Sequence, residues 1–248
     1  TGRRVVKTWM IDDLLPTAQG AYETIGELID ADIVKEMNII SFHNNEQMSN
    51  AWHERIAEGE EYISNGVDED YYDQYFNTGF GASMVLSSML IDLDTLLSKW
   101  RVYLKSKKSL IEDVFNIGEM RLTDSHVEYQ NMKARNIIFC DGVSSFSSPY
   151  FSKLPFALTK GEALIVEIPH LPQNNIYKSG ISLVPIGQEC YWVGSSFEWE
   201  FSDAAPSESF RLKTERQLSA FLKVPFNIIE HIASVRPGSI ERRPFVGR

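Results

Sequence analysis

A chain of 248 residues, of which 43% are hydrophobic and 12% aromatic, can build one large domain or two small ones around a substantial core. This composition excludes wholesale disorder, collagen-like repeats and a coiled-coil rod. Thirty-four acidic against 24 basic residues give a formal net charge of -10, so most of the surface would repel nucleic acid or an anionic membrane.

The sequence predicts neither a membrane span nor a metal site. No apolar stretch approaches the roughly 20 residues that cross a bilayer, and no signal-type apolar run follows the first residues. The five histidines are dispersed, so we expect no zinc site. Cys140 and Cys190 lie in apolar segments, which predicts reduced, buried thiols rather than a disulfide framework. Together these features predict a cytoplasmic protein.

Both ends of the sequence resemble the middle of a secondary-structure element. At the start, two arginines lead into apolar residues 5–6, and at the end residues 244–248 have the pattern of a strand and turn. A strand at a chain end would leave unpaired backbone groups and an exposed edge. We therefore expect further segments on both sides of this sequence.

Three helices and one strand are predicted in the first hundred or so residues. Apolar side chains recur at helical spacing over 18–29, 46–60 and about 83–105. A short apolar strand is predicted at 38–42, between the first two helices.

Two loops in this part invite a functional interpretation. The acidic stretch 59–73 lacks the glycine and terminal glutamate of a calcium loop, so a solvated loop is the better prediction. The glycine-rich stretch 79–83 lacks the third glycine and the preceding strand of a phosphate-binding loop. We expect it to cap the helix that follows.

Two apolar segments after the long helix are predicted to be strands, at 110–115 and 136–140, with a polar hairpin region between them. The second is an unbroken apolar run that ends in Asp141-Gly142. Continuous apolarity is typical of a strand covered on both faces, as in a parallel sheet.

The second half predicts an antiparallel sheet of short strands separated by Gly, Pro and Asn. These strands are expected at 163–168, 181–185, 191–193 and 197–201. A helix follows Ser207 and turns Phe210, Leu218, Phe221 and Leu222 inward, and a last strand spans 229–235. The fold class is therefore α+β: a large mixed or antiparallel sheet with helices, joined to a smaller α/β part.

Two segments are candidates for binding a ligand. A buried strand that ends in Gly142 would let the backbone approach a ligand at the edge of a sheet. Arg236, at the end of an apolar strand, could present a fixed fork to a carboxylate, although a structural arginine fits the same pattern. Glu198 and Glu200 are interpreted as a solvated carboxylate face.

Three blocks together resemble the FAD-dependent oxidoreductases of the D-amino-acid oxidase and glycine oxidase group. They span 137–145, 154–162 with its Lys-Gly-Glu pattern, and 236–247 with its Arg-Pro start and Pro-Phe-Val-Gly end. The segment 191–195 supports the likeness. Each block alone is a weak signal, whereas the three in this order are a strong one.

The resemblance implies an activity and a set of site residues. Hydride would pass from a substrate carbon that bears an amine to the flavin. Arg236 would bind the substrate carboxylate, and Ser182 stands where relatives place a tyrosine that assists this arginine. By the same resemblance, the FAD site would be lined by Val114, Cys140, Asp141, Gly142, Val143 and Gly247.

The resemblance also implies how the domains alternate. Residues 1–83 and 149–235 would form the substrate domain, 84–148 an incomplete FAD-binding domain, and 236–248 a return to it. The glycine-rich motif that meets the FAD pyrophosphate would lie outside this sequence, so we expect the isolated chain to hold FAD poorly and to be inactive.

Two other functions remain open from the sequence. The tRNA-modifying flavin enzymes share this architecture, although the acidic balance argues against a nucleic-acid partner. A noncatalytic binding module would use the antiparallel sheet and its aromatic residues Tyr191, Trp192, Phe197 and Trp199, although aromatic strand residues more often belong to a core. The leading prediction is an enzyme with a small amine or amino-acid substrate.

Overall fold

The computed structural model describes residues 7–241 and divides the chain into two compact units. Unit 1 comprises the described residues of Thr1–Lys99 together with Lys160–Ser234. Unit 2 comprises Trp100–Thr159 and the described residues of Val235–Arg248. Each unit is therefore built from two separate stretches of the sequence.

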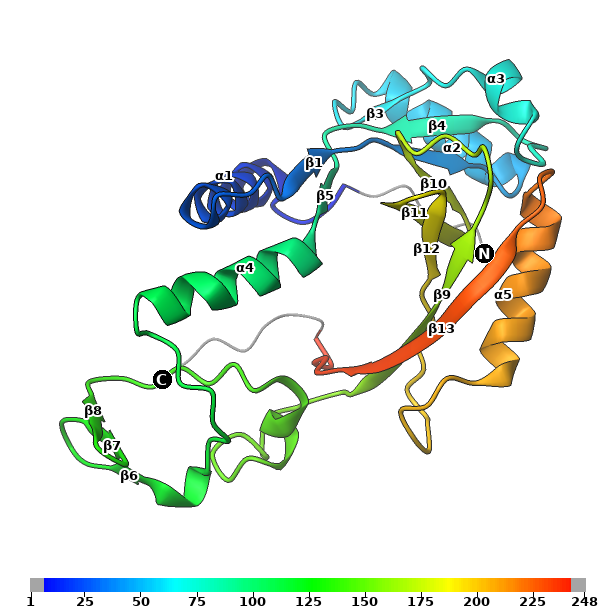
Figure 1. Ribbon diagram of the computed structural model, residues 1–248. Coiled ribbons are helices and arrows are strands. Elements are labelled where there is room, and N and C mark those ends of the chain that lie inside the picture. Colours follow the sequence, from blue (N-terminus) through cyan, green and yellow to red (C-terminus); the bar gives the residue numbers. More distant parts are fainter. Residues whose placement is uncertain (1–6, 242–248) are drawn as a thin grey trace. The chain divides into compact units, whose positions relative to one another are not determined.

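Unit 1 is organised around an eight-stranded mixed sheet (Figure 1). The order across the sheet is β13 (Asn227–Arg236), β9 (Thr159–Glu167), β12 (Cys190–Gly194), β11 (Ile181–Gly187), β10 (Ile176–Ser179), β2 (Ile39–Phe42), β4 (Ala82–Val85) and β3 (Ile63–Ser64). From β9 to β3 neighbouring strands run antiparallel, except that β10 and β2 run parallel. A separate two-stranded sheet pairs β1 (Val34–Glu36) with β5 (Met89–Ile91).

The core of unit 1 lies against one face of this sheet. In β11 the buried residues Ile181, Leu183 and Pro185 alternate with half-buried ones, as expected for a strand with one covered face. Residues from α5 (Glu208–Phe221) complete the core. The fully buried or nearly buried members of this core include Ile40, Phe42, Phe76, Leu164, Val166, Tyr177, Leu183, Tyr191, Val193, Phe210, Leu218 and Phe221.

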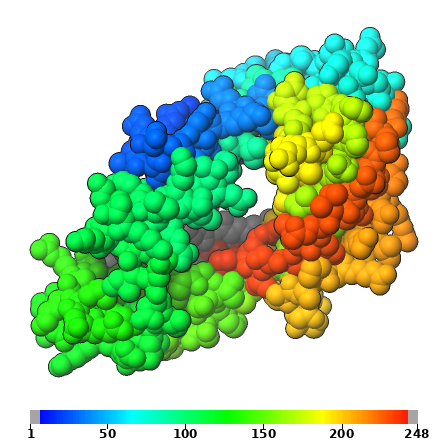
Figure 2. Space-filling model, in the orientation of Figure 1, coloured from blue at the N-terminus to red at the C-terminus, as the bar shows by residue number. Residues whose placement is uncertain are grey.

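Segments far apart in sequence meet in unit 1. The Asn77 backbone N–H donates to the Phe221 carbonyl at 2.7 Å, and the Lys223 ammonium lies 2.7 Å from the Asp73 carboxylate. Figure 2 shows the cyan residues near 75 beside the orange residues near 220. The end of α5 is thus held by the last residue of α3 (Glu69–Asp73) and by the segment that follows it.

Side-chain caps fix where three of the helices begin. Asn45 accepts a hydrogen bond from the Met48 N–H at the start of α2 (Glu46–Ala57), and Asp68 accepts one from the Tyr71 N–H at the start of α3. Ser207 accepts one from the Phe210 N–H at the start of α5. Each cap satisfies a backbone donor that the helix leaves unpaired.

Unit 2 is smaller and has little regular structure. It contains the end of α4 (Leu93–Ser106), the 3-10 turns η1 (Ile117–Glu119) and η2 (Gly142–Ser147), and a three-stranded meander. The meander consists of β6 (Met120–Leu122), β7 (Val127–Tyr129) and β8 (Met132–Ala134), paired antiparallel. This meander is the predicted polar hairpin region.

Most predicted elements of unit 1 are confirmed within a few residues: β2, α2, β9, β11, β12, α5 and the strand that ends at Arg236. The mixed sheet with helices confirms the α+β class. The first helix is longer than predicted, because α1 (Ile11–Ile29) continues through Pro16. The prediction of a loop over the acidic stretch 59–73 is wrong in part, since this stretch contains β3 and α3, with Asp68 as a helix cap.

The helix predicted over 83–105 is wrong in its first half. Residues 82–85 form β4, which pairs with β2 and β3, and α4 begins only at Leu93. The reason is a cap at Asp92, whose carboxylate accepts bonds from the Thr95 N–H at 2.9 Å and the Thr95 hydroxyl at 2.7 Å. The glycine-rich stretch 79–83 therefore precedes a strand and caps no helix.

Three predicted strands are also wrong. Segments 110–115 and 136–140 pair with no strand among residues 7–241, and in 197–201 only Glu198 forms a bridge, to Lys160. An extended segment needs a partner to satisfy its backbone, and sequence pattern does not reveal whether a partner exists. Cys140 is consequently exposed rather than buried, and Cys190 is half-buried; both thiols are free.

Candidate functional site

The turn that follows Arg236 is anchored to residues 155–157, all within unit 2. The Ala157 N–H donates a hydrogen bond to the Gly238 carbonyl at 2.8 Å, and the Ile240 N–H donates one to the Pro155 carbonyl at 3.1 Å. Phe156 and Ser239 form an antiparallel bridge between these two bonds. Two of the three sequence blocks that carry the resemblance are therefore in direct contact.

The approach of these two segments is close enough to require glycine at position 238. A side-chain Cβ built there would lie 2.7 Å from the Ala157 carbonyl oxygen, which is far inside normal contact distance. The Gly238 N–H also donates to the Arg236 carbonyl at 2.9 Å, which closes a tight turn around Pro237. The backbone on the C-terminal side of Arg236 is thus held firmly.

Arg236 itself is the last residue of β13 and is half-buried. Ser182 lies in β11 of unit 1, directly opposite Lys178 of β10 and Gly194 of β12. Because its neighbours Ile181 and Leu183 face the core, the Ser182 side chain lies on the other face of the sheet. Arg236 and Ser182 belong to different units.

Val114 lines a pocket in unit 2. Its side chain is 85% exposed, and its N–H donates to the Asp113 carboxylate at 2.8 Å. The pocket has a volume of about 260 Å³ and mainly apolar walls. Its lining residues are Ile111, Asp113, Val114, Phe115, Val127, Tyr129, Gln130, Met132, Ala134, Asn136 and Ile137.

The pocket brings together residues that no sequence pattern connects. It joins Val114 to the meander β6–β8 and to the apolar run 136–140, whose Ile138 is 84% exposed. The aromatic rings of Phe115 and Tyr129 contact each other at 4.6 Å between centroids. The alternation of apolar residues in the meander is the signal that could have identified this wall.

Asp141, Gly142 and Val143 lie at the start of η2, just after that run. The Ser145 hydroxyl donates to the Asp141 carboxylate. Gly142 has a φ of 58°, in the left-handed region, and a Cβ built there would meet nothing within 4 Å. Glycine adopts this backbone conformation without strain, and the backbone there is open to a ligand. Gly247 lies outside the described residues.

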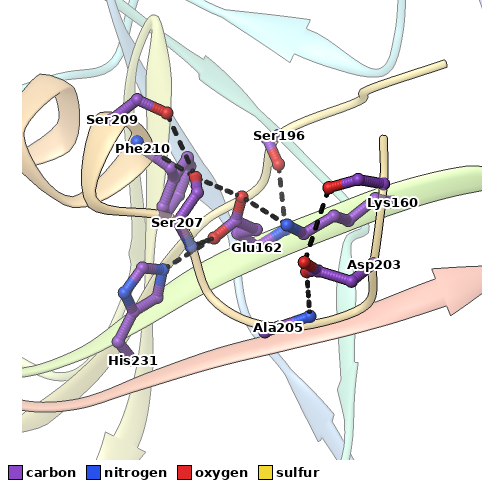
Figure 3. A network of polar contacts seen from close by, with 10 residues as sticks. Lys160, Glu162, Ser196, Asp203, Ala205, Ser207, Ser209, Phe210 and His231 are labelled. Carbon is purple, nitrogen blue, oxygen red and sulfur yellow. Dashed lines mark hydrogen bonds and ion pairs between the residues drawn. The ribbon is translucent and has the colours of Figure 1, made fainter. Parts of the chain in front are cut away.

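Unit 1 contains a buried ionic network around Glu162 (Figure 3). The sequence analysis did not predict this network. The Glu162 side chain in β9 is fully buried, and its carboxylate accepts bonds from the Ser207 hydroxyl at 2.7 Å and the Ser207 N–H at 2.6 Å. His231 Nε2 lies 2.9 Å from the carboxylate and Lys160 Nζ lies 3.5 Å from it. The signal that could have found it is the Lys-Gly-Glu triplet that opens an otherwise apolar strand.

The network keeps this carboxylate charged. Burial alone raises the pKa of Glu162, but the Ser207 hydroxyl and N–H, then Lys160 and His231, outweigh burial and lower the pKa below its ordinary value. Lys160 is almost as buried as Glu162. The pair is thus a desolvated ion pair whose hydrogen bonds hold three segments together.

The four rings proposed for a noncatalytic module differ in exposure. Tyr191 is fully buried and Trp192 is half-buried, whereas Phe197 is 68% and Trp199 50% exposed. In the part of the chain that the structure describes, no group of three His, Cys, Asp or Glu side chains could hold a metal ion. None of the helices within residues 7–241 is both long enough and apolar enough to cross a membrane.

No protein-family model matches the sequence. The structure, however, is similar to solved oxidases over nearly its whole length. Glycine oxidase from Geobacillus kaustophilus is 15% identical with a TM-score of 0.74, over 94% of this chain and 68% of that chain. Glycine oxidase from Bacillus cereus ATCC 14579 is 13% identical with a TM-score of 0.75, over 98% of this chain and 74% of the other.

A third structure, iminodiacetate oxidase from Chelativorans sp. BNC1, is 17% identical with a TM-score of 0.73. The match covers 98% of this chain and 73% of that chain. At these identities the likeness establishes the fold, which confirms the resemblance drawn from the three sequence blocks at the level of architecture.

Proposed function

Because the chain has the fold of the D-amino-acid-oxidase-like FAD oxidoreductases, we propose that it forms part of an FAD-dependent enzyme that oxidises an amine or amino acid. The observation that carries the proposal is the anchored turn after Arg236. Two segments about 80 residues apart meet there through backbone hydrogen bonds and hold a half-buried arginine at the end of a strand.

The mainly apolar unit 2 pocket has room for one ring system rather than for a whole flavin nucleotide, and of the described residues proposed for FAD, Val114 alone lines it. Apolar walls around about 260 Å³ suit a planar ring, and Asp113 and Asn136 add polar atoms for its edge. We propose that Val114, Cys140, Asp141, Gly142 and Val143 hold FAD, and that Gly247 joins them. When bound, FAD supplies the acceptor for the hydride.

Arg236 is proposed to orient the substrate through its carboxylate. A guanidinium offers two parallel N–H donors that match the two carboxylate oxygens, and its charge is permanent. Ser182 is too short to replace the tyrosine of relatives. Arg236 would therefore carry most of the carboxylate binding. Residues 1–83 and 149–235 are proposed as the substrate domain, and 84–148 with 236–248 as the FAD-binding domain.

The first test is the flavin itself. A polypeptide that contains this whole chain should purify yellow, with a flavin absorption spectrum, and should oxidise at least one compound in a panel of amino acids and secondary amines. A well-folded, colourless protein that takes up no added FAD would refute the proposal.

The second test is Arg236. In the flavin-loaded protein, Arg236→Ala should raise KM for a carboxylate substrate by about 30-fold or more, since removing one partner of a charged pair costs about 2 to 5 kcal/mol. Arg236→Lys should raise KM by a smaller factor, because lysine keeps the positive charge but lacks the two parallel N–H donors of the guanidinium. Arg211→Ala, an exposed arginine of α5, serves as the matched control and should leave KM unchanged.

Two exposed rings favour a second candidate, the noncatalytic binding module. Phe197 and Trp199 offer apolar surface that the core does not use. If this candidate is right, Trp199→Ala should abolish ligand binding in a protein without flavin. Salt-dependent binding to tRNA would instead favour the tRNA-modifying enzymes. The cytoplasmic compartment is part of the main proposal, supported by two unpaired thiols.

A further inference from the structure

Strand β13 is an edge strand whose position is weakly set by apolar packing. It borders only β9, and none of its ten residues, all of which the structure describes, is buried; Ile228 is the one partly buried hydrophobic of β13 that packs against the core. Ile229 is 59% exposed. Because most of β13 is exposed or half-buried, apolar packing opposes a slip in register only weakly, and a slip of two residues displaces every side chain by about 6.6 Å.

Two side-chain bonds join β13 to β9. His231 lies 2.9 Å from the Glu162 carboxylate, and the Asn227 amide donates to the Glu167 carboxylate at 3.2 Å. Glu162 of β9 is bonded to His231, and Glu167, further along β9, is bonded to Asn227, which comes earlier in β13. This order is the one expected for antiparallel strands. The first bond is partly buried and ends on a fully buried carboxylate, whereas the second is exposed, so the first resists exchange with water more strongly.

The buried bond cannot move by one residue without breaking the network around it. Ser207 holds both oxygens of Glu162, and Lys160 supplies the opposing charge. The His231 ring stacks on Phe210 of α5, with 5.6 Å between ring centroids. If β13 shifted, the buried Glu162 carboxylate would lose the His231 donor. Leaving a buried charge without one of its partners is strongly destabilising.

We propose that Glu162 and His231 are positioning residues that hold Arg236 in place along β13. This inference rests on the proposed role of Arg236 in substrate binding. Arg236 lies between two anchors of the same strand: the Glu162–His231 bond five residues before it, and the backbone bonds of Gly238 two residues after it. The second anchor fixes the turn, and the first fixes the register of the strand that enters it.

The test uses the flavin-loaded protein with His231→Leu, which removes the bond but keeps an apolar contact to Phe210. Amide hydrogen exchange at residues 232–236 should become about tenfold faster, as expected for the loss of one buried bond. KM for a carboxylate substrate should rise about tenfold while kcat changes little, because binding is affected rather than the chemistry. KM for an amine without a carboxylate should not change.

Two further variants make the result specific. His231→Gln keeps an N–H donor on the same face of the strand. Its exchange rates at 232–236 and its KM should therefore stay close to those of the parent protein. Asn227→Ala removes the exposed bond at the far end of β13 and is the matched control, expected to alter neither. If His231→Leu does not fold, His231→Asn, whose amide is too short to reach Glu162, takes its place.

The two proposals fail in different ways. Unchanged exchange at 232–236, or an equal rise in KM for both kinds of substrate, would overturn the positioning role whatever the enzyme oxidises. A colourless protein in which exchange nevertheless accelerates would uphold the anchor on β13 and reject the proposed function.

Discussion

Gly238 and Glu162 are the two residues on which the candidate site depends most directly. A Cβ at position 238 would lie 2.7 Å from the Ala157 carbonyl oxygen, and hydrogen bonds hold the backbone of both residues in place. Gly238→Ala should therefore lower the free energy of unfolding by about 1 to 3 kcal/mol, as strain of this kind does. Urea denaturation measures the change.

Gly20 provides the control for that substitution. It lies inside α1, and a Cβ built there would meet nothing within 4 Å. Gly20→Ala should stabilise the protein by up to about 1 kcal/mol, because alanine favours a helix more than glycine does. If both substitutions changed stability equally, close approach would not be the reason for glycine at 238.

Glu162 makes stability depend on pH. Its pKa is lowered in the folded protein from an ordinary value of 4.5, so the folded state favours the charged carboxylate. Its contribution is fully present above the unfolded pKa and is lost as the pH falls through the lower folded pKa. Glu162→Gln should be less stable than the parent at pH 7, and the difference should shrink as the pH falls below the ordinary value of 4.5.

Urea unfolding at a series of pH values tests this. Glu54→Gln, at an exposed carboxylate of α2, should run parallel to the parent at every pH. A gap between parent and Glu162→Gln that stayed constant over the whole series would show that the charge of Glu162 is not what stabilises the network.

Among the elements, α4 owes its start to one carboxylate. Asp92 accepts both the N–H and the hydroxyl of Thr95, and these two bonds lower the pKa of Asp92. Asp92→Ala should cost about 1 kcal/mol, the usual loss for an N-cap, whereas Asp92→Asn should keep most of it. Chemical denaturation and helix content by circular dichroism distinguish the two variants.

The wrong element predictions have a common physical cause. Apolar side chains at helical spacing continue through residues 84–90, yet this stretch contains parts of the short strands β4 and β5, which are too short to show an alternating pattern. Their state is decided by β2 and β1, which offer them backbone partners. The apolar run 136–140 has the pattern of a buried strand but finds no such partner in the described chain.

For the protein as a whole, bound FAD should increase stability. A ligand that binds only the folded state at about 100 times its Kd adds about 2.7 kcal/mol to the free energy of unfolding. The midpoint of thermal unfolding of a polypeptide that contains this chain should therefore rise with FAD concentration. Val114→Asp, which adds a charge to the proposed pocket, should reduce this rise.

Local sequence patterns were enough to predict the fold class, the strands β9, β11, β12 and β13, the helix α5, and the resemblance that led to Arg236. Alternation, helical spacing and short motifs record these features directly. In β11 alternate residues are buried, as an extended chain with one covered face requires, whereas β9 and β12 carry unbroken apolar runs that also predict a strand.

Only the tertiary structure shows which residues that are distant in the sequence are in contact. Folding joins Pro155–Ala157 to Gly238, gathers Val114 with the meander, and buries Lys160, Glu162 and His231 together. A buried charge is tolerated only where partners from other segments satisfy it, and a strand exists only where another strand pairs with it. Both conditions depend on how the chain returns on itself, which no local pattern encodes.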